Sequence, residues 1–91
     1  MNLKLLRKIA KKFSVHVTTK SDVPGCVSIC ADGESVESVY FNLQTGFMRL
    51  RKPSWPWHRG DFAEAIALAL TKRNPDRLKN LTRTIRRMAA A

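Results

Sequence analysis

The spacing of apolar residues changes twice along this chain, and these changes restrict it to a fold that mixes helices with strands. Apolar side chains recur every three or four positions over residues 3–13, at every second position through most of residues 13–52, and with the helical spacing again over residues 61–89. A period near 3.6 residues is typical of an amphipathic helix, and a period of two is typical of a half-buried strand. The sequence therefore predicts one α+β domain over residues 1–91, with a helix, four antiparallel strands and two further helices.

The first helix is predicted over residues 2–12. Its apolar stripe is formed by Leu3, Leu6, Ile9, Ala10 and Phe13, and lysine and arginine fill the opposite side. Such a stripe also suits a membrane surface, but this one runs directly into an alternating segment, which favours packing on a sheet. No apolar run approaches the ~20 residues that a membrane span needs, and the first residues lack the pattern of a secretory signal.

A four-stranded antiparallel sheet is predicted over residues 13–52. Breaks at Pro24-Gly25, Asp32-Gly33 and Thr45-Gly46 separate the four alternating segments. A two-residue turn at the last of these breaks would place Leu43 opposite Met48. The apolar residues of the last two strands would then share one face, and the other face would carry Tyr40, Asn42, Arg49 and Arg51.

Two helices are predicted after the sheet, over residues 61–73 and 75–89, and both are expected to pack on one face of it. Asp61 is a candidate N-cap for the first helix, with Glu64 three residues later. Pro75 suits the first position of the second helix. The apolar stripe of that helix consists of Leu78, Leu81, Ile85 and Met88.

The chain carries a net charge of +10, from 17 lysine and arginine residues against 7 aspartate and glutamate residues. The distribution is uneven, since residues 21–48 hold all four of their charges as acids and contain no lysine or arginine. Like charges repel one another in the compact state and attract polyanions, and nucleic acid is the commonest such partner. A basic surface that is only solvated is the alternative.

Residues 53–60 are predicted to form a loop in which tryptophans lie among prolines and basic side chains. In the stretch RLRKPSWPWHRGD, residues 49–61, Trp55 and Trp57 flank Pro56. Aromatic rings stack on bases and arginines bind phosphates, but tryptophan and arginine are also the favoured anchors of protein interfaces. We expect one tryptophan to pack on the core and the other to stay exposed as an anchor.

The last helix adds a second group of basic residues. Arg83, Arg86 and Arg87 fall within two turns, and no acidic residue follows Asp76. This density favours contact with a phosphate backbone, although charge outside a single apolar stripe is also the ordinary pattern of a surface helix.

Metal and enzyme sites are not predicted. His16, Cys26, Cys30 and His58 are residue types that bind zinc, but two cysteines four residues apart on one strand hold their sulfurs too far apart for one ion. The same spacing, about 13 Å between Cα atoms, excludes a disulfide, and two cysteines are few for a secreted chain, so we expect a reducing cytoplasmic location. No glycine-rich phosphate loop, nucleophile elbow or pair of carboxylates is present, so we expect neither catalysis nor a cofactor.

The leading interpretation is a small cytoplasmic protein that binds nucleic acid, either DNA or RNA, mainly through the phosphate backbone with aromatic stacking in addition. The candidate binding residues are Tyr40, Arg49, Arg51, Lys52, Trp55, Trp57, Arg59, Arg83, Arg86 and Arg87. The alternative is a phage-type accessory or inhibitor protein that docks on an acidic host protein or a nucleoprotein complex through its Trp/Arg loop.

Overall fold

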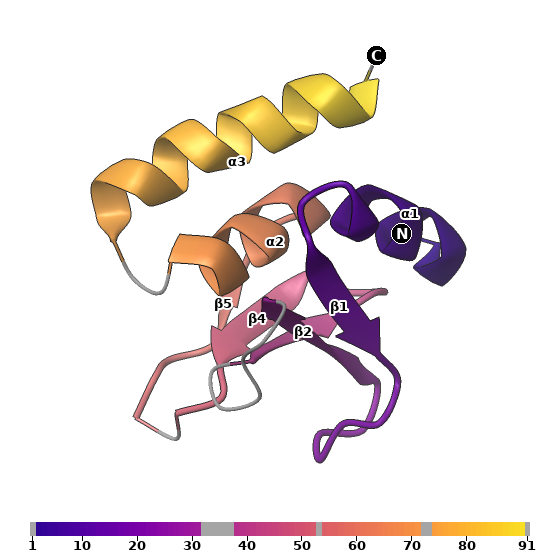
Figure 1. The fold of residues 1–91 in the computed structure, drawn as a ribbon. Helices are drawn as coiled ribbons and strands as arrows, with labels where there is room; N and C mark the ends of the chain where they lie inside the picture. Colours follow the sequence, from indigo (N-terminus) through magenta and orange to yellow (C-terminus); the bar gives the residue numbers. More distant parts are fainter. Residues whose placement is uncertain (1, 32–37, 53, 72–73, 91) are drawn as a thin grey trace.

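The computed structural model describes residues 2–31, 38–52, 54–71 and 74–90, so the turn predicted at residues 32–33 lies outside the described residues. Within these residues the chain forms three helices and five strands: α1 (Leu3–Lys11), β1 (Val15–Thr18), β2 (Cys26–Ala31), β3 (Val39–Asn42), β4 (Phe47–Leu50), β5 (His58–Arg59), α2 (Phe62–Thr71) and α3 (Pro75–Ala90). Each strand pairs antiparallel with the next, in the order β1-β2-β3-β4-β5. Figure 1 shows all three helices on one side of this sheet. The predicted α+β class is confirmed, and the sheet has one strand more than expected.

The starts of the two C-terminal helices agree with their sequence signals. Asp61 caps α2, since its Oδ1 accepts a hydrogen bond of 3.0 Å from the backbone N–H of Glu64. α3 begins at Pro75, as predicted. The side-chain oxygen of Asn74, just before it, accepts a hydrogen bond of 3.3 Å from the N–H of Arg77.

α2 is the middle layer of the fold. It is apolar on nearly every side, and its buried residues are Ala63, Ala65, Ile66, Ala67, Leu68, Ala69 and Thr71. A helix of this kind needs cover all round, and here the sheet covers one side and α3 the other (Figure 1). α3 therefore packs mainly on α2, which corrects the expectation that both helices lie on the sheet. Neither α2 nor any other described helix is long and apolar enough to cross a membrane.

The predicted apolar stripe of α3 is confirmed in part. Ile85 is fully buried, and Leu78 and Leu81 pack at the edge of the core. Met88, in contrast, is 45% exposed, whereas Thr82, which was not predicted to belong to the stripe, is buried. The side of α3 that faces α2 is therefore turned slightly from the predicted one.

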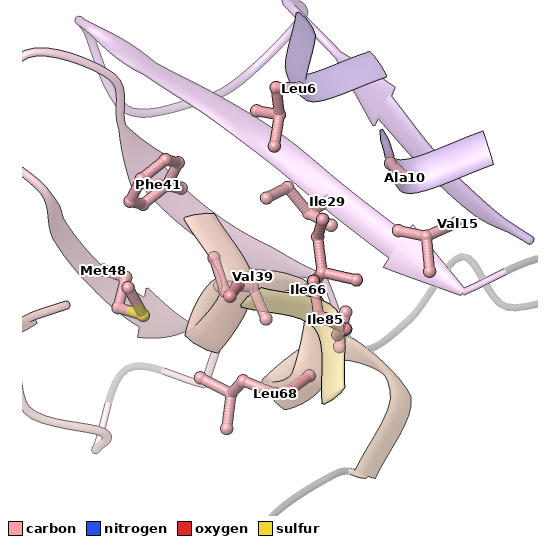
Figure 2. Close-up of a cluster of buried hydrophobic side chains, with 14 of the residues drawn as sticks. Leu6, Ala10, Val15, Ile29, Val39, Phe41, Met48, Ile66, Leu68 and Ile85 are labelled. Carbon is pink, nitrogen blue, oxygen red and sulfur yellow. The ribbon is translucent and has the colours of Figure 1, made fainter. Parts of the chain in front are cut away.

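The core lies between the sheet and α2, with α1 along one side. Figure 2 shows its members, which include Leu6 and Ala10 of α1, Val15, Ile29, Val39, Phe41 and Met48 of the sheet, Ile66 and Leu68 of α2, and Ile85 of α3. Because neighbouring residues of a strand point to opposite sides, the residues that alternate with these point away from the helices. This outward side is the polar, basic face predicted from the sequence, with Tyr40 opposite Arg49 on β3 and β4.

The register of β3 and β4 differs from the predicted register by two residues. Phe41 lies opposite Met48, where Leu43 was expected. The connection is a longer loop than a two-residue turn, closed by a hydrogen bond of 2.9 Å from the N–H of Gly46 to the carbonyl of Asn42. A shift of two leaves every side chain on its original face, so the predicted faces are right although the predicted pairing is wrong.

β5 lies inside the segment that was predicted to be a loop. His58 pairs with Met48, and Arg59 pairs with Phe47, at the edge of the sheet. This short strand brings the tryptophan-containing segment alongside β4, which positions the site described next.

Candidate functional site

The outward side of the sheet carries an aromatic–arginine face, formed by Tyr40 of β3, Phe47 and Arg49 of β4, Trp57, and Arg59 of β5. The strand register brings these residues together, because Arg49 lies opposite Tyr40 and Arg59 lies opposite Phe47. Trp57 directly precedes β5, and continuing the same register places it on the other side of Arg49. The face lies on the side of the sheet away from the three described helices (Figure 1).

Arg49 is the centre of this face. Its guanidinium carbon is 5.2 Å from the centroid of the Tyr40 ring and 5.0 Å from the centroid of the Trp57 ring. The two rings are themselves stacked, with centroids 6.4 Å apart and planes inclined by 25°. Both cation–ring distances lie within the ~6 Å at which a cation is attracted to an aromatic ring. The guanidinium therefore contacts both rings.

The same guanidinium also holds the end of β4. Its Nη1 donates hydrogen bonds to the carbonyl oxygens of Leu50 at 3.0 Å, Arg51 at 3.3 Å and Lys52 at 3.0 Å. Hydrogen bonds from a charged donor are stronger than those between neutral groups. Arg49 was predicted to bind a partner directly, and in the structure its Nη1 bonds within the chain while the guanidinium lies against the Trp57 ring.

A second ring and a second arginine lie beside the first pair. The guanidinium carbon of Arg59 is 5.0 Å from the centroid of the Phe47 ring. Phe47 is 40% exposed and Trp57 is 43% exposed. Their register positions are diagonal across β4 and β5, where side chains stand roughly 7–8 Å apart. The face therefore presents two open rings, each with an arginine against it.

Tyr40 and Trp55 are covered. Tyr40, a predicted stacking residue, is only 5% exposed and lies against Trp57 and Arg49, where it supports the face from within. Trp55 is half-buried and packs against the core, and its backbone N–H donates to the carbonyl of Lys52 at 2.9 Å. The expected division between an inward and an exposed tryptophan is confirmed.

Three of the predicted binding residues are exposed cations in the same part of the sequence. Arg51 and Lys52 lie just beyond β4, and Arg59 lies on β5. Nη2 of Arg51 is 3.8 Å from Oδ2 of Asp22, but these side chains are 51% and 81% exposed, so the attraction between them is weak. The side chain of Arg51 can therefore turn towards an anionic ligand.

The arginines of α3 lie on a different surface. α2 separates α3 from the sheet (Figure 1), so Arg83, Arg86 and Arg87 do not join the aromatic–arginine face. Arg83 and Arg87 are exposed, whereas Nε of Arg86 donates to Oδ2 of Asp61 at 2.6 Å. Partial burial alone raises the pKa of Asp61, but the hydrogen bond and charge of Arg86, together with the N–H of Glu64, outweigh burial and hold this pKa below its ordinary value. Arg86 thus ties α3 to the start of α2.

The residue types considered as zinc ligands are spread across the sheet. His16 lies opposite Cys30 on β1 and β2, while His58 lies on β5 at the other edge, with Nε2 at 3.1 Å from Oε2 of Glu64. Both cysteines are free thiols, and burial raises the pKa of Cys26. Over the described part of the chain, no three His, Cys, Asp or Glu residues are placed to hold one metal ion.

Phe47 is the site residue that sequence reasoning missed. It is two residues before Arg49 on one strand, which places both on the same side, and this alternation was the available signal. Its contact with Arg59 depends on β5, which was not expected.

In comparisons with protein-family models, curated proteins and solved structures, nothing matches this chain.

Proposed function

We propose that this protein binds single-stranded nucleic acid on the aromatic–arginine face. The observation that carries the proposal is the pair of exposed rings, Phe47 and Trp57, each against an arginine on the open side of the sheet. Exposed rings of this kind stack on bases, and each stacked base contributes about 1–3 kcal/mol. The net charge of +10 supplies a general attraction to a polyanion.

The exposed rings of the face favour unpaired bases over a duplex. In a duplex each base is covered by its neighbours, whereas an unpaired base offers its ring to an aromatic side chain. Phe47 and Trp57 stand on a sheet surface, and the described helices, which could enter a duplex groove, lie on the other side (Figure 1). Their diagonal separation of roughly 7–8 Å suits two neighbouring bases that are splayed apart.

The cations of the face serve two purposes in this proposal. Arg51, Lys52 and Arg59 are exposed, and in this proposal they neutralise phosphates. Arg49 holds Trp57 in place before the ligand arrives, which reduces the entropy that the ring loses on binding. Bases on the rings and phosphates at the rim give a mode of binding that tolerates many base sequences.

Fluorescence anisotropy with short labelled oligonucleotides tests the proposal. The probes are single-stranded DNA, single-stranded RNA and duplex DNA of one base sequence, at near-physiological salt. We expect at least one of the single strands to bind roughly tenfold more tightly than the duplex, or better. Equal or tighter binding of the duplex would overturn the proposal.

Two substitutions locate the site. Trp57→Ala and Phe47→Ala should each weaken binding of the single strand by about 1–3 kcal/mol, because each removes one stacking surface. Met88→Ala removes an equally exposed apolar side chain from α3 and is the matched control, expected to bind as the wild type does. If no oligonucleotide binds at near-physiological salt, the proposal fails, and the exposed Trp57 would instead favour docking on a protein partner.

A further inference from the structure

A groove runs along the free edge of β1. It has a volume of about 510 Å³ and is lined by Arg7 and Lys11 of α1 and by residues 14–17. β1 is the edge strand of the sheet and pairs with β2, and no described residue pairs with its other edge. The edge of a sheet presents unpaired backbone groups, which are a template for another extended chain.

Two contacts show that α1 runs antiparallel to β1 beside this groove. The N–H of Ser14 donates to the carbonyl of Lys11 at 3.2 Å, so Lys11 lies at the start of the strand. Nε of Arg7 donates to the carbonyl of Val17 at 3.4 Å, so Arg7 lies near its end. Arg7 and Lys11 therefore line the groove towards opposite ends of the strand.

The contact with Arg7 also shows which backbone groups face the groove. The carbonyl of Val17 accepts from a side chain outside the sheet, so it points away from β2. In an antiparallel strand the N–H and C=O of one residue point to the same side, as do those of the residue two positions away. Val15 and Val17 thus direct donors and acceptors to the groove with the spacing of a strand, and the Val17 carbonyl, which already accepts from Arg7, has a second lone pair.

The spacing of the cations matches that of side chains on an added strand. Arg7 and Lys11 are four residues apart, about 6 Å along the helix axis. Alternate residues of a strand are about 6.6–6.8 Å apart and point to the same side. A segment paired with β1 would therefore present every second side chain to Arg7 and Lys11, and acidic side chains suit those positions.

We propose that the free edge of β1 binds an extended acidic segment of a partner protein, which adds a strand to the sheet and places two acidic side chains, two residues apart, on Arg7 and Lys11. A second copy of this chain paired through the same edge would bring the two cations of each copy together, which charge repulsion opposes. A nucleic acid would match the charge but leave the outward N–H and C=O groups of Val15 and Val17 without backbone partners. This interaction does not depend on nucleic-acid binding at the other edge of the sheet.

Fluorescence anisotropy with three labelled heptapeptides tests the proposal. The first alternates glutamate with valine, the second has the same composition with its glutamates consecutive, and the third is the first with N-methyl groups on alternate backbone amides. We expect the alternating peptide to bind, and the affinity of each of the other two to be lower by a factor of roughly ten or more. Equal binding of all three would overturn the proposal, because it would reduce the interaction to net charge.

Paired variants place the peptide in the groove. Arg7→Ala with Lys11→Ala should weaken the alternating peptide roughly tenfold or more, because it removes both cations that meet its glutamates. Lys4→Ala with Lys8→Ala removes the same charge from the exposed surface of the same helix and should leave binding unchanged. Equal weakening by the two pairs would overturn the proposal. Two other results would also overturn the proposal, because each identifies another occupant of the groove. One is that single-stranded DNA displaces the peptide and that this DNA binding requires Arg7 and Lys11. The other is that the protein self-associates in sedimentation and that the Arg7→Ala, Lys11→Ala pair abolishes this association.

Discussion

The guanidinium of Arg49 joins the exposed ring of Trp57 to the backbone at the end of β4. Its carbon is 5.0 Å from the ring centroid, and its Nη1 donates to the carbonyls of Leu50 and Lys52 at 3.0 Å. A planar guanidinium can lie against a ring and donate along its edge at the same time, which a compact ammonium group cannot. The orientation of Trp57 therefore depends on an arginine at this position.

Replacing Arg49 with lysine should weaken the fold while the net charge stays the same. Arg49→Lys loses the planar contact with the rings and part of the carbonyl bonding, and we expect the free energy of unfolding to fall by about 1–2 kcal/mol. Urea unfolding followed by tryptophan fluorescence measures the change. Arg87→Lys, at an exposed position on α3, is the matched control and should stay within about 0.5 kcal/mol of the wild type. Equal stability of the two variants would show that the guanidinium contacts contribute nothing.

Truncating the two tryptophans should separate packing from exposure. Trp55→Ala removes a half-buried ring from the core and should cost about 2–3 kcal/mol of stability, less than the ~3–5 kcal/mol of a fully buried ring. Trp57→Ala removes a ring that is 43% exposed and should cost no more than about 1 kcal/mol. Urea denaturation at neutral pH, read by circular dichroism, compares them. Similar losses in both variants would contradict this division of roles.

The helices and most of the strands were predictable because their signals are local. The change of period, the cap at Asp61 and the start at Pro75 are all properties of neighbouring residues. The position of α3 also had a signal that was not used: α2 is apolar on nearly every side, and such a helix needs a second layer over it.

The rest of the site depends on contacts between distant segments. β5 is two residues long and becomes a strand only because the edge of β4 is available to pair with it. The register of β3 and β4 depends on a loop in which Gly46 has φ of 80°. The amino-acid sequence alone did not distinguish this loop from a two-residue turn. Trp55 and Trp57 would share a side in a regular strand, so their division requires the irregular segment around Pro56.

The two glycines with positive φ should respond differently to alanine. Gly25 and Gly46 have φ of 81° and 80°, so an added Cβ strains both, by about 1–2 kcal/mol. At Gly46 the new Cβ would also lie 2.7 Å from the carbonyl oxygen of Gly60, whereas at Gly25 its nearest neighbour is a side-chain nitrogen of Asn42 at 3.4 Å. Gly46→Ala should therefore cost about 1–3 kcal/mol more than Gly25→Ala in thermal or urea unfolding. Equal costs would show that the loop next to Gly60 moves freely to make room.

Stability should depend on pH through the pair formed by Asp61 and Arg86. Partial burial raises the pKa of Asp61, but Arg86 and the cap hydrogen bond outweigh burial and lower it in the folded protein. The unfolded chain therefore binds more protons in acid, so the stabilisation is complete above the unfolded pKa and is lost as the pH falls through the folded pKa. Asp61→Asn keeps the cap oxygen and removes the charge.

Urea unfolding of the wild type and Asp61→Asn over a series of pH values tests this dependence. At pH 7 the wild type should be more stable by at most about 1 kcal/mol, because the side chains of Arg86 and Asp61 are 54% and 40% exposed and water screens their attraction. The difference should shrink as the pH falls below 3.8, the ordinary pKa of the carboxyl group. A difference that persists unchanged in acid would mean that the shape of the side chain matters and its charge does not.

The salt dependence of binding should show which basic surface meets the nucleic acid. Each phosphate contact to a single strand contributes about 0.7 to the slope of log affinity against log salt. Arg51→Ala and Arg59→Ala, at the rim of the aromatic–arginine face, should each weaken binding and flatten the slope by about this amount. Arg83→Ala and Arg87→Ala remove the same charge from α3, which α2 separates from the face, so they should leave the slope unchanged (Figure 1).

A slope that responds only to the α3 variants would mean that the phosphates lie along α3 and that the proposed face is wrong. If the variants of both pairs flatten the slope, one strand must reach around the protein, whose longest extent is 33 Å. The binding of an oligonucleotide too short to do so should then change with the rim variants alone.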